Sequence, residues 1–312
     1  MATVFRGRAV SKPDILHDLV FMHDRGGQGR FRDLPNVQLR IVRKGRLEGM
    51  VRFAARQHEY SDVSVTSLPT VANELARDGQ RVHYEFHSST LQVIRDELGI
   101  LDLAKVATLR VPSRYMSQIV AQELPMEMAS MVEVVPNVVD RSVFSVCGPT
   151  SDSICRKFGR PIVWIGRFDK GKNPNDLIRA LSLMPDDFWA VVIVSMESDP
   201  GRMADFLATL SQYGLQDRAR VFLNLEQGKI AQIYRAAAQS GGVFCSTSLA
   251  ESFGYGVAEA LACGLPVAAY DVGALGELGA VDRQLLLIPP GDVRQLARAI
   301  EELSGAHGPD VA

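Results

Sequence analysis

Residues 244–273 read FCSTSLAESFGYGVAEALACGLPVAAYDVG, and this stretch decides the fold. It begins as a short apolar strand, passes through a glycine-containing turn into an alanine-rich helix, and ends in a second apolar strand. Continuously apolar strands are typically buried on both faces, and a helix that joins two of them forms a parallel βαβ unit. One residue departs from this pattern, because Glu259 is an acid in a helix that is otherwise apolar nearly all round.

The same alternation of strand and helix fills the chain from Pro161 onward. It predicts a doubly wound parallel sheet with helices between its strands. Apolar runs typical of buried strands lie at 161–166, 188–195, 219–224, 241–247, 265–271 and 285–290, and helical patterns lie at 176–184, 201–214, 229–239, 255–264 and 293–303.

The first half of the chain has the features of a second α/β domain. We expect strands at 18–24, 37–44, 62–67, 81–87 and 106–113, and helices at 71–79 and 114–124. The segment 145–161 has the Gly, Pro and Ser content of a linker. The boundary is therefore expected near residue 150, with one domain at 1–150 and another at 151–312. Two such sheets would bring their strand ends to a shared cleft, where open α/β sheets bind ligands.

The composition argues against several classes of protein. The 312 residues are enough for one large domain or two ordinary ones. A net charge of −2 argues against a dedicated nucleic-acid binder. No apolar run approaches the roughly 20 residues that span a bilayer. The four cysteines form no CxxC pair, which disfavours a structural zinc site and favours a reducing cytoplasm.

The loop GRFDKGKNP, at 166–174, places Arg167, Lys170 and Lys172 directly after a buried strand. Cations on a loop that opens a helix are suited to neutralising phosphates, together with the amides of the helix N-terminus. The alternative is a solvated basic loop, because Lys and Arg are ordinary surface residues.

A second element suited to anions precedes the helix at 255–264. Gly254 and Gly256 would let the backbone approach a ligand closely, and Ser252 could cap the helix. The same glycines could instead serve close packing of the helix on the sheet.

Two acids belong to this region, Glu251 before the helix and Glu259 within it. An ionised acid in a buried helix is costly unless it has a partner. A carboxylate can accept hydrogen bonds from both hydroxyls of a sugar diol, so each acid could hold one hydroxyl pair. The alternative for Glu259 is the single solvent-facing position of an otherwise buried helix.

These residues resemble a known family. The stretch ESFGYGVAE, from Glu251 to Glu259, resembles the E-x7-E signature of retaining nucleotide-sugar glycosyltransferases of the GT-B fold, glycosyltransferase family 4. Segments 165–181, 244–273 and 285–300 are similar to that family's carboxy-terminal domain in order and spacing, and segments 82–89, 111–124 and 132–144 resemble later parts of its amino-terminal domain. The resemblance covers about residues 60–304 and implies two Rossmann-like domains that face a cleft.

The resemblance also implies roles for individual residues. Arg167 and Lys172 would hold the donor diphosphate, Glu251 the hydroxyls of the transferred sugar, and Glu259 the ribose. His87 matches the histidine of the amino-terminal domain that approaches the donor sugar. The remaining substrate-binding residues implied near the diphosphate, sugar and base are Gly166, Ser252, Phe253, Gly254, Tyr255, Asn224, Leu225, Ser246 and Thr247. Neither a metal nor a cofactor is implied.

The implied reaction is transfer of a hexose from a UDP- or GDP-sugar to a glycan or lipid-linked acceptor, with retention of configuration. The common settings of the family are polysaccharide and envelope glycoconjugate synthesis.

His83 and His87 could instead suggest a metal pair, but they alternate along a strand with Glu85 and lack a further cluster. Polar strand residues are therefore the favoured interpretation.

A basic segment occupies residues 25–56, which hold nine Arg or Lys and two acids, a net of +7. Such a segment could contact the anionic inner face of a membrane or a phosphate-bearing acceptor. A solvated basic face, balanced by acids elsewhere, is an equally good interpretation.

The resemblance weakens at both ends of the chain. Family members usually begin with a strand, a glycine-rich loop and a helix, whereas DLVFMHDRGGQGRF, at 18–31, resembles the second strand and its loop. The closing helix of the family does not follow the last matched residues. We therefore expect an abbreviated amino-terminal domain, and a catalytically weak nucleotide-sugar-binding or partner subunit is the main alternative. An epimerase of the same fold is disfavoured by the paired acids, and a Rossmann oxidoreductase by the lack of a GxGxxG motif with its acid.

Overall fold

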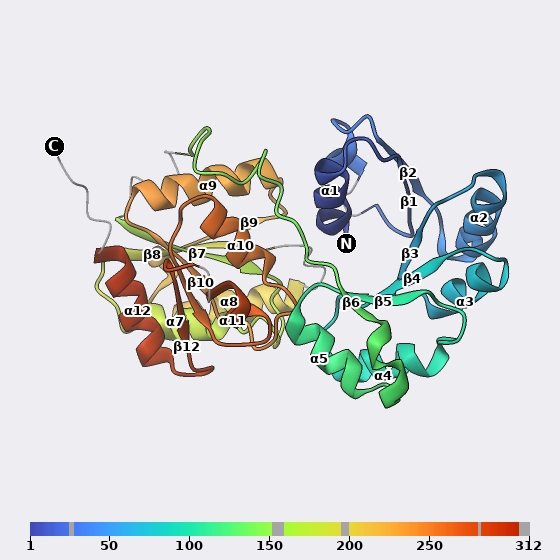
Figure 1. Ribbon diagram of the computed structural model, residues 1–312. Coiled ribbons are helices and arrows are strands. Elements are labelled where there is room, and N and C mark those ends of the chain that lie inside the picture. The colour runs from blue at the N-terminus through green and yellow to red at the C-terminus, as the bar shows by residue number, and fades with distance from the viewer. Residues whose placement is uncertain (25–27, 152–158, 195–199, 280–281, 306–312) are drawn as a thin grey trace. The chain divides into compact units, whose positions relative to one another are not determined.

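The computed structural model describes residues 1–24, 28–151, 159–194, 200–279 and 282–305. The chain divides into two compact units, Met1–Asp140 and Arg141–Ala312 (Figure 1). No helix within the described residues is long and apolar enough to cross a bilayer.

The carboxy-terminal unit contains one six-stranded sheet in the order β12-β11-β10-β7-β8-β9. Every pair of neighbouring strands is parallel. The predicted doubly wound α/β sheet is therefore confirmed for this unit. Its strands are β7 (Arg160–Gly166), β8 (Phe188–Val194), β9 (Ala219–Leu223), β10 (Val243–Ser246), β11 (Val267–Tyr270) and β12 (Leu285–Ile288).

Helices lie on both faces of this sheet. Side chains from α7, α8 and α12 pack with Trp164 and Cys245 in one core cluster. On the other face Tyr234 of α9 meets Phe244 of β10, with ring centroids 5.6 Å apart. The helices are α7 (Pro174–Leu181), α8 (Pro200–Gln212), α9 (Gln227–Gln239), α10 (Tyr255–Ala262), α11 (Leu275–Gly279) and α12 (Val293–Gly305), with a 3-10 turn η3 (Gln216–Arg218).

The strand order of this sheet reverses between β7 and β10. From β7 the chain adds β8 and β9 on one side, then returns to place β10 against the other side of β7 and continues outward. The crossover helices diverge at such a switch point, and the carboxyl ends of the two strands form a crevice that suits a ligand.

The amino-terminal unit contains two parallel sheets, β1-β2 and β3-β4-β5-β6. All five predicted strands are present, but they do not form one continuous sheet. The strands are β1 (His17–Phe21), β2 (Val37–Ile41), β3 (Val63–Thr66), β4 (Val82–Glu85), β5 (Thr108–Val111) and β6 (Val132–Val134). Its helices are α1 (Ala2–Ser11), α2 (Lys44–Gln57), α3 (Pro69–Arg77), α4 (Leu91–Ile100) and α5 (Arg114–Gln122), with 3-10 turns η1 (Gln28–Phe31) and η2 (Met126–Met131).

The four-stranded sheet has one apolar face and one polar face. On β4, Val82 and Tyr84 join the core cluster formed with α3, α4 and α5. The alternate residues, His83 and Glu85, are equally buried at 1% exposure but belong to a network of polar contacts. The period-two alternation of this strand therefore separates core from polar residues.

The division between the units falls after Asp140, whereas the boundary predicted from the sequence is near residue 150. One buried side chain explains why the intervening residues belong to the second unit. The Arg235 guanidinium, on α9, donates to the carbonyls of Val143, Ser145 and Pro149 at 2.9–3.2 Å. These bonds hold residues 143–149 against α9 rather than leaving them as a free linker.

Candidate functional site

The candidate site lies at the switch point, on the loops that follow β7 and β10. Parallel neighbouring strands end at the same edge of a sheet, so loop 167–173 and loop 247–254 emerge side by side. Half of the site residues predicted from the sequence lie on these two loops, namely Arg167, Lys172, Thr247, Glu251, Ser252, Phe253 and Gly254.

Backbone and hydroxyl contacts join the two loops. The amide of Leu249 donates to the carbonyl of Gly171 at 2.8 Å. The Thr247 hydroxyl donates to the Lys172 carbonyl at 2.9 Å and accepts from the Trp164 indole N–H at 3.0 Å. Because Thr247 is fully buried and both bonds are internal, its side chain holds the loops in register.

An ion pair connects the functional side chains of the two loops. Lys172 Nζ lies 2.5 Å from Glu251 Oε1, with side-chain exposures of 28% and 15%. Asp169 shapes the first loop by accepting from the Lys172 amide at 2.9 Å. Arg167 pairs with Asp169 at 2.9 Å, and its side chain is 62% exposed. The structure thus brings Lys172 and Glu251 into contact and leaves Arg167 largely in solvent on the same loop.

The turn before α10 is held by the loop that follows β11. Gly254 is the N-cap of α10 and has φ +85°, a left-handed conformation that favours glycine. Gly273 lies so close that an added Cβ would be 2.0 Å from the Glu251 carbonyl oxygen, and that oxygen also accepts from Ala274 at 3.0 Å. The contacts with Gly273 and Ala274 therefore fix the backbone of loop 247–254 at Glu251, just before the helix begins.

Two expectations about the start of α10 need correction or refinement. Ser252 is not the N-cap, because Gly254 occupies that position and no side chain caps the helix. Gly256 serves packing, since a Cβ there would meet Ile165 at 2.9 Å and Phe244 at 3.1 Å. Phe253 and Tyr255 are half-buried and pack edge to face, with ring centroids 4.9 Å apart.

Glu259 is buried, at 7% exposure, so the solvent-facing alternative for this residue is wrong. Its carboxylate lies close enough to Tyr234 to affect the pKa of that residue. Burial, and then the negative charge of Glu259, raise the pKa of Tyr234 well above its ordinary value. The acid thus lies within the protein, on the helix that begins at the site.

The remaining predicted residues lie along the same carboxyl edge of the sheet. Gly166 ends β7 and is buried, and a Cβ there would be 2.8 Å from the Trp164 ring. Ser246 ends β10 and is also buried. Asn224 and Leu225 follow β9, which β8 and β7 separate from β10, and Asn224 has φ +51°. The predicted base-binding residues therefore do not lie together, because two strands separate Asn224 and Leu225 from Ser246 along the carboxyl edge of the sheet.

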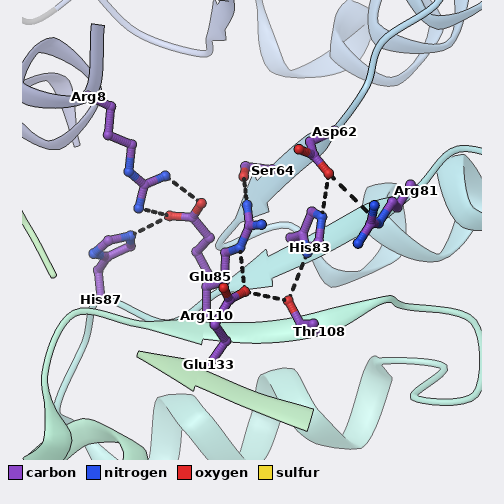
Figure 2. Close-up of polar contacts among 10 residues, drawn as sticks. All are labelled: Arg8, Asp62, Ser64, Arg81, His83, Glu85, His87, Thr108, Arg110 and Glu133. Carbon is purple, nitrogen blue, oxygen red and sulfur yellow. Dashed lines mark hydrogen bonds and ion pairs between the residues drawn. The ribbon is translucent and has the colours of Figure 1, made fainter. Parts of the chain in front are cut away.

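His87 belongs to the amino-terminal unit, where it contacts an ion pair (Figure 2). Its Nε2 lies 3.0 Å from Glu85, whose carboxylate also accepts two bonds from Arg8 at 2.6 and 2.9 Å. Sequence reasoning placed Glu85 on the same strand face as His87 but missed Arg8, which comes from a helix that was not predicted.

His83 belongs to a separate set of contacts in the same view (Figure 2). Its Nε2 lies 2.8 Å from Asp62 and its Nδ1 lies 2.8 Å from Thr108. The two histidines therefore contact different carboxylates rather than forming a pair. Within the described ranges, no three His, Cys, Asp or Glu side chains are grouped as metal ligands.

The basic segment at 25–56 is partly neutralised by acids outside it. Arg40 pairs with Asp18, and Arg52 pairs with Asp78 at 2.9 Å and with Glu74 at 3.1 Å. Other cations of the segment are exposed, namely Arg32, Arg43, Lys44, Arg46 and Arg56. Residues 25–27 of the RGGQG motif lie outside the described residues.

Comparison with known proteins gives a match in sequence to part of the chain. Residues 159–305 match the profile of a family described as "Glycosyl transferases group 1". A D-inositol 3-phosphate glycosyltransferase of Xylanimonas cellulosilytica is 35% identical over 154 residues, which are 46% of this chain and 36% of the relative. A 2-deoxystreptamine glucosyltransferase of Streptomyces kanamyceticus is 28% identical over 191 residues, which are 58% of this chain and 47% of the relative. The chain thus matches less than half the length of either relative.

Solved structures are similar over nearly the whole chain. Anabaena HepE, determined in complex with UDP and glucose, has a TM-score of 0.80 at 17% identity, covering 96% of this chain and 85% of that one. A sucrose-phosphate synthase from Thermosynechococcus elongatus has a TM-score of 0.71 at 19% identity, covering 96% and 82%. At these identities the likeness concerns the fold alone, and it confirms the predicted GT-B architecture of Rossmann-like α/β units.

Proposed function

We propose that this chain, whose residues 159–305 match the profile of the glycosyl transferases group 1 family, transfers a hexose from a nucleotide diphosphate sugar. The proposed donor is a UDP- or GDP-sugar, and the proposed acceptor is a glycan or a lipid-linked acceptor. The proposed reaction retains the configuration of the sugar. HepE, which has the same fold, was determined in complex with UDP-glucose, and this supports a nucleotide-sugar donor.

The observation that carries the proposal is the Lys172–Glu251 pair at the switch point. A cation there can stabilise the negative charge that develops on the departing diphosphate. A carboxylate beside it can accept hydrogen bonds from sugar hydroxyls. The cation proposed for the leaving group, Lys172, and the carboxylate proposed for the sugar, Glu251, are therefore in direct contact.

Other residues would complete the donor site. We propose that Arg167, which is exposed on the same loop, turns to the diphosphate, and that the amides at Gly254 and Tyr255 assist it. Glu259 would hold the ribose diol, with the base near Asn224, Leu225 and Ser246. Thr247 would support the donor site from behind, because it is fully buried and its hydroxyl bonds to Trp164 and to the Lys172 carbonyl. From the amino-terminal unit, His87 would serve the donor sugar.

A direct assay tests the proposal. Purified protein is incubated with UDP-, GDP- and ADP-sugars, with and without candidate glycan acceptors, and nucleotide release is measured. We expect Lys172→Ala and Glu251→Ala each to lower the release rate by about 100-fold or more, which is the usual effect of removing a preorganised charge. Arg298→Ala is the control, since Arg298 is an exposed cation on α12 and lies outside both loops. Equal rates in all three variants would contradict the assigned roles.

The second candidate is a binding or partner subunit with little turnover. The split sheet of the amino-terminal unit favours it, because that unit would supply the acceptor side. Tight nucleotide-sugar binding without release in any mixture would support this candidate, whereas a lack of any nucleotide-sugar affinity would overturn both.

We also propose a peripheral contact with anionic lipid through the exposed cations of segment 25–56. Basic patches bind such surfaces through screened electrostatic attraction. Cosedimentation with phosphatidylserine vesicles should fall as salt rises and should fall further in an Arg43→Ser, Lys44→Ser, Arg46→Ser variant. Lack of binding at low salt would remove the membrane contact.

A further inference from the structure

A buried carboxylate links the first helix of the chain to His87 (Figure 2). Glu85, at the end of β4, is 1% exposed. Arg8 of α1 donates to both of its oxygens, and His87 Nε2 lies 3.0 Å from Oε2. The side chains of Arg8 and His87 are 18% and 14% exposed, so the three groups meet in a largely enclosed place.

Glu85 is ionised in this arrangement. Burial alone would raise the pKa of its carboxyl, but the hydrogen bonds from His87 and Arg8 outweigh burial and bring the pKa to about 2. An ionised carboxylate offers only acceptors, so the His87 Nε2 that faces it must carry a hydrogen. In a neutral imidazole the basic nitrogen is then Nδ1.

Arg8 is held in place by its own surroundings. Its guanidinium lies 5.5 Å from the ring centroid of Phe5, one turn earlier on α1. Phe5 in turn meets Phe21 at the end of β1, with centroids 6.1 Å apart. The planar fork of an arginine suits a carboxylate that must keep one orientation.

We propose that Glu85, fixed by Arg8, is a positioning residue that holds His87 as its Nε2–H tautomer with one ring orientation. The proposal rests on the proposed function in so far as His87 serves the donor sugar. The proposal gives α1 a role in function through Arg8, although no residue of that helix was among the predicted site residues. Glu85 itself acts only through His87.

The tautomer of His87 can be measured without any enzymatic activity. Long-range ¹H–¹⁵N correlation spectra of labelled protein distinguish the two ring nitrogens, and a His87→Asn variant assigns the signal among the six histidines. In the neutral imidazole we expect the Nε2–H form in the wild type and a shift toward the Nδ1–H form in Glu85→Gln. Glu133→Gln is the matched control, because Glu133 lies on the same polar face and pairs with Arg110 instead. An Nδ1–H form in the wild type, or no change in Glu85→Gln, would overturn the proposal.

Arg8→Lys is a second variant in case Glu85→Gln does not fold. It keeps the positive charge but loses the fork, so we expect a smaller shift of the same sign in the His87 signal. A His87 spectrum unchanged in Arg8→Lys would show that Arg8 has no part in the positioning.

A double-mutant cycle separates positioning from a merely structural effect. We expect Glu85→Gln to lower kcat about tenfold, within the usual range of coupling between contacting residues, and less than about twofold when His87 is already Ala. Equal losses in both backgrounds would overturn the coupling. If the wild type transfers no sugar, the proposed function fails, and the tautomer measurement still decides whether Glu85 positions His87.

Discussion

Thr247 shows how a single buried hydroxyl can support the candidate site. It accepts from the Trp164 indole at 3.0 Å and donates to the Lys172 carbonyl at 2.9 Å. Replacement by the isosteric Val would leave both partners without their bond, and a buried unsatisfied group costs about 1–3 kcal/mol. We therefore expect Thr247→Val to lower the free energy of unfolding by that amount in urea titrations.

A second threonine provides the control for this prediction. The Thr209 hydroxyl, on α8, donates to the Asp205 carbonyl at 2.8 Å in an exposed position. Thr209→Val should change the free energy of unfolding by no more than about 0.5 kcal/mol, because water replaces the lost bond. If the two variants behave alike, Thr247 does not tie the loops together.

Glu85 predicts an acid-sensitive contribution to stability. Its pKa is about 2 in the folded protein, against an ordinary value of 4.5. A lowered pKa stabilises the fold fully above the ordinary value and loses that stabilisation as pH falls toward the folded value. We expect the free energy of unfolding to fall between about pH 5 and pH 2 more steeply in the wild type than in Glu85→Gln. Parallel curves across this range would contradict the ionised state of Glu85.

At the scale of residues, the sequence predicted which charged groups lie at the site better than it predicted the partners of individual side chains. The charges of Lys172 and Glu251 and their positions after two strands predicted that both would lie at one sheet edge, where they form an ion pair. The assignment of Ser252 as a cap was wrong because a glycine nearer the helix adopted the N-cap conformation. The partner of Glu85 could not be foreseen, since Arg8 is 77 positions away in sequence.

Helix α10 carries Glu259, and its distance from the sheet depends on a glycine. A Cβ at Gly256 would lie 2.9 Å from Ile165 and 3.1 Å from Phe244. Gly256→Ala should push the helix outward and lower the free energy of unfolding by about 1–3 kcal/mol, as overpacking does. Donor affinity should fall as well, if Glu259 holds the ribose. Differential scanning calorimetry and donor titrations would measure the two effects.

Helix α9 offers the matched glycine. Gly228 has no neighbouring atom within 4 Å of an added Cβ. Gly228→Ala should therefore be neutral or stabilise the protein by about 0.4–1 kcal/mol. A loss of stability equal to that of Gly256→Ala would show that helix backbone effects, and not contact with the sheet, set the result.

Elements were predictable where their residues follow a clear period. All six strands of the carboxy-terminal sheet were expected, because buried parallel strands are continuously apolar. Helix α1 was missed because its buried side includes Arg6 and Gly7 rather than an apolar stripe. Arg6 is buried against Asp33 and Asp140, and a Cβ at Gly7 would lie 2.4 Å from the Val138 carbonyl oxygen. Helix α4 gave a weak signal since Ile94 is its one fully buried residue.

The two units should differ in stability when the whole chain unfolds. The carboxy-terminal unit has one six-stranded sheet with helices on both faces, whereas the amino-terminal unit divides its strands into sheets of two and four. Each sheet of the amino-terminal unit therefore has fewer strands that can unfold cooperatively with one another. We expect the amino-terminal unit to unfold at lower urea, so that amides of β4 lose protection from hydrogen exchange before those of β8. Simultaneous loss at both strands would contradict this order.

The divided sheet also affects how the protein behaves at high concentration. Among the described residues, β1 pairs only with β2 and β3 pairs only with β4. Each of these strands therefore has one side on which its backbone N–H and C=O groups make no ladder with a neighbouring strand. Open edges of this kind favour the addition of strands from other chains and consequently aggregation. Within the described residues the amino-terminal unit has four such edge strands, against two (β9 and β12) in the carboxy-terminal sheet, so aggregation is expected to begin more readily at the amino-terminal unit.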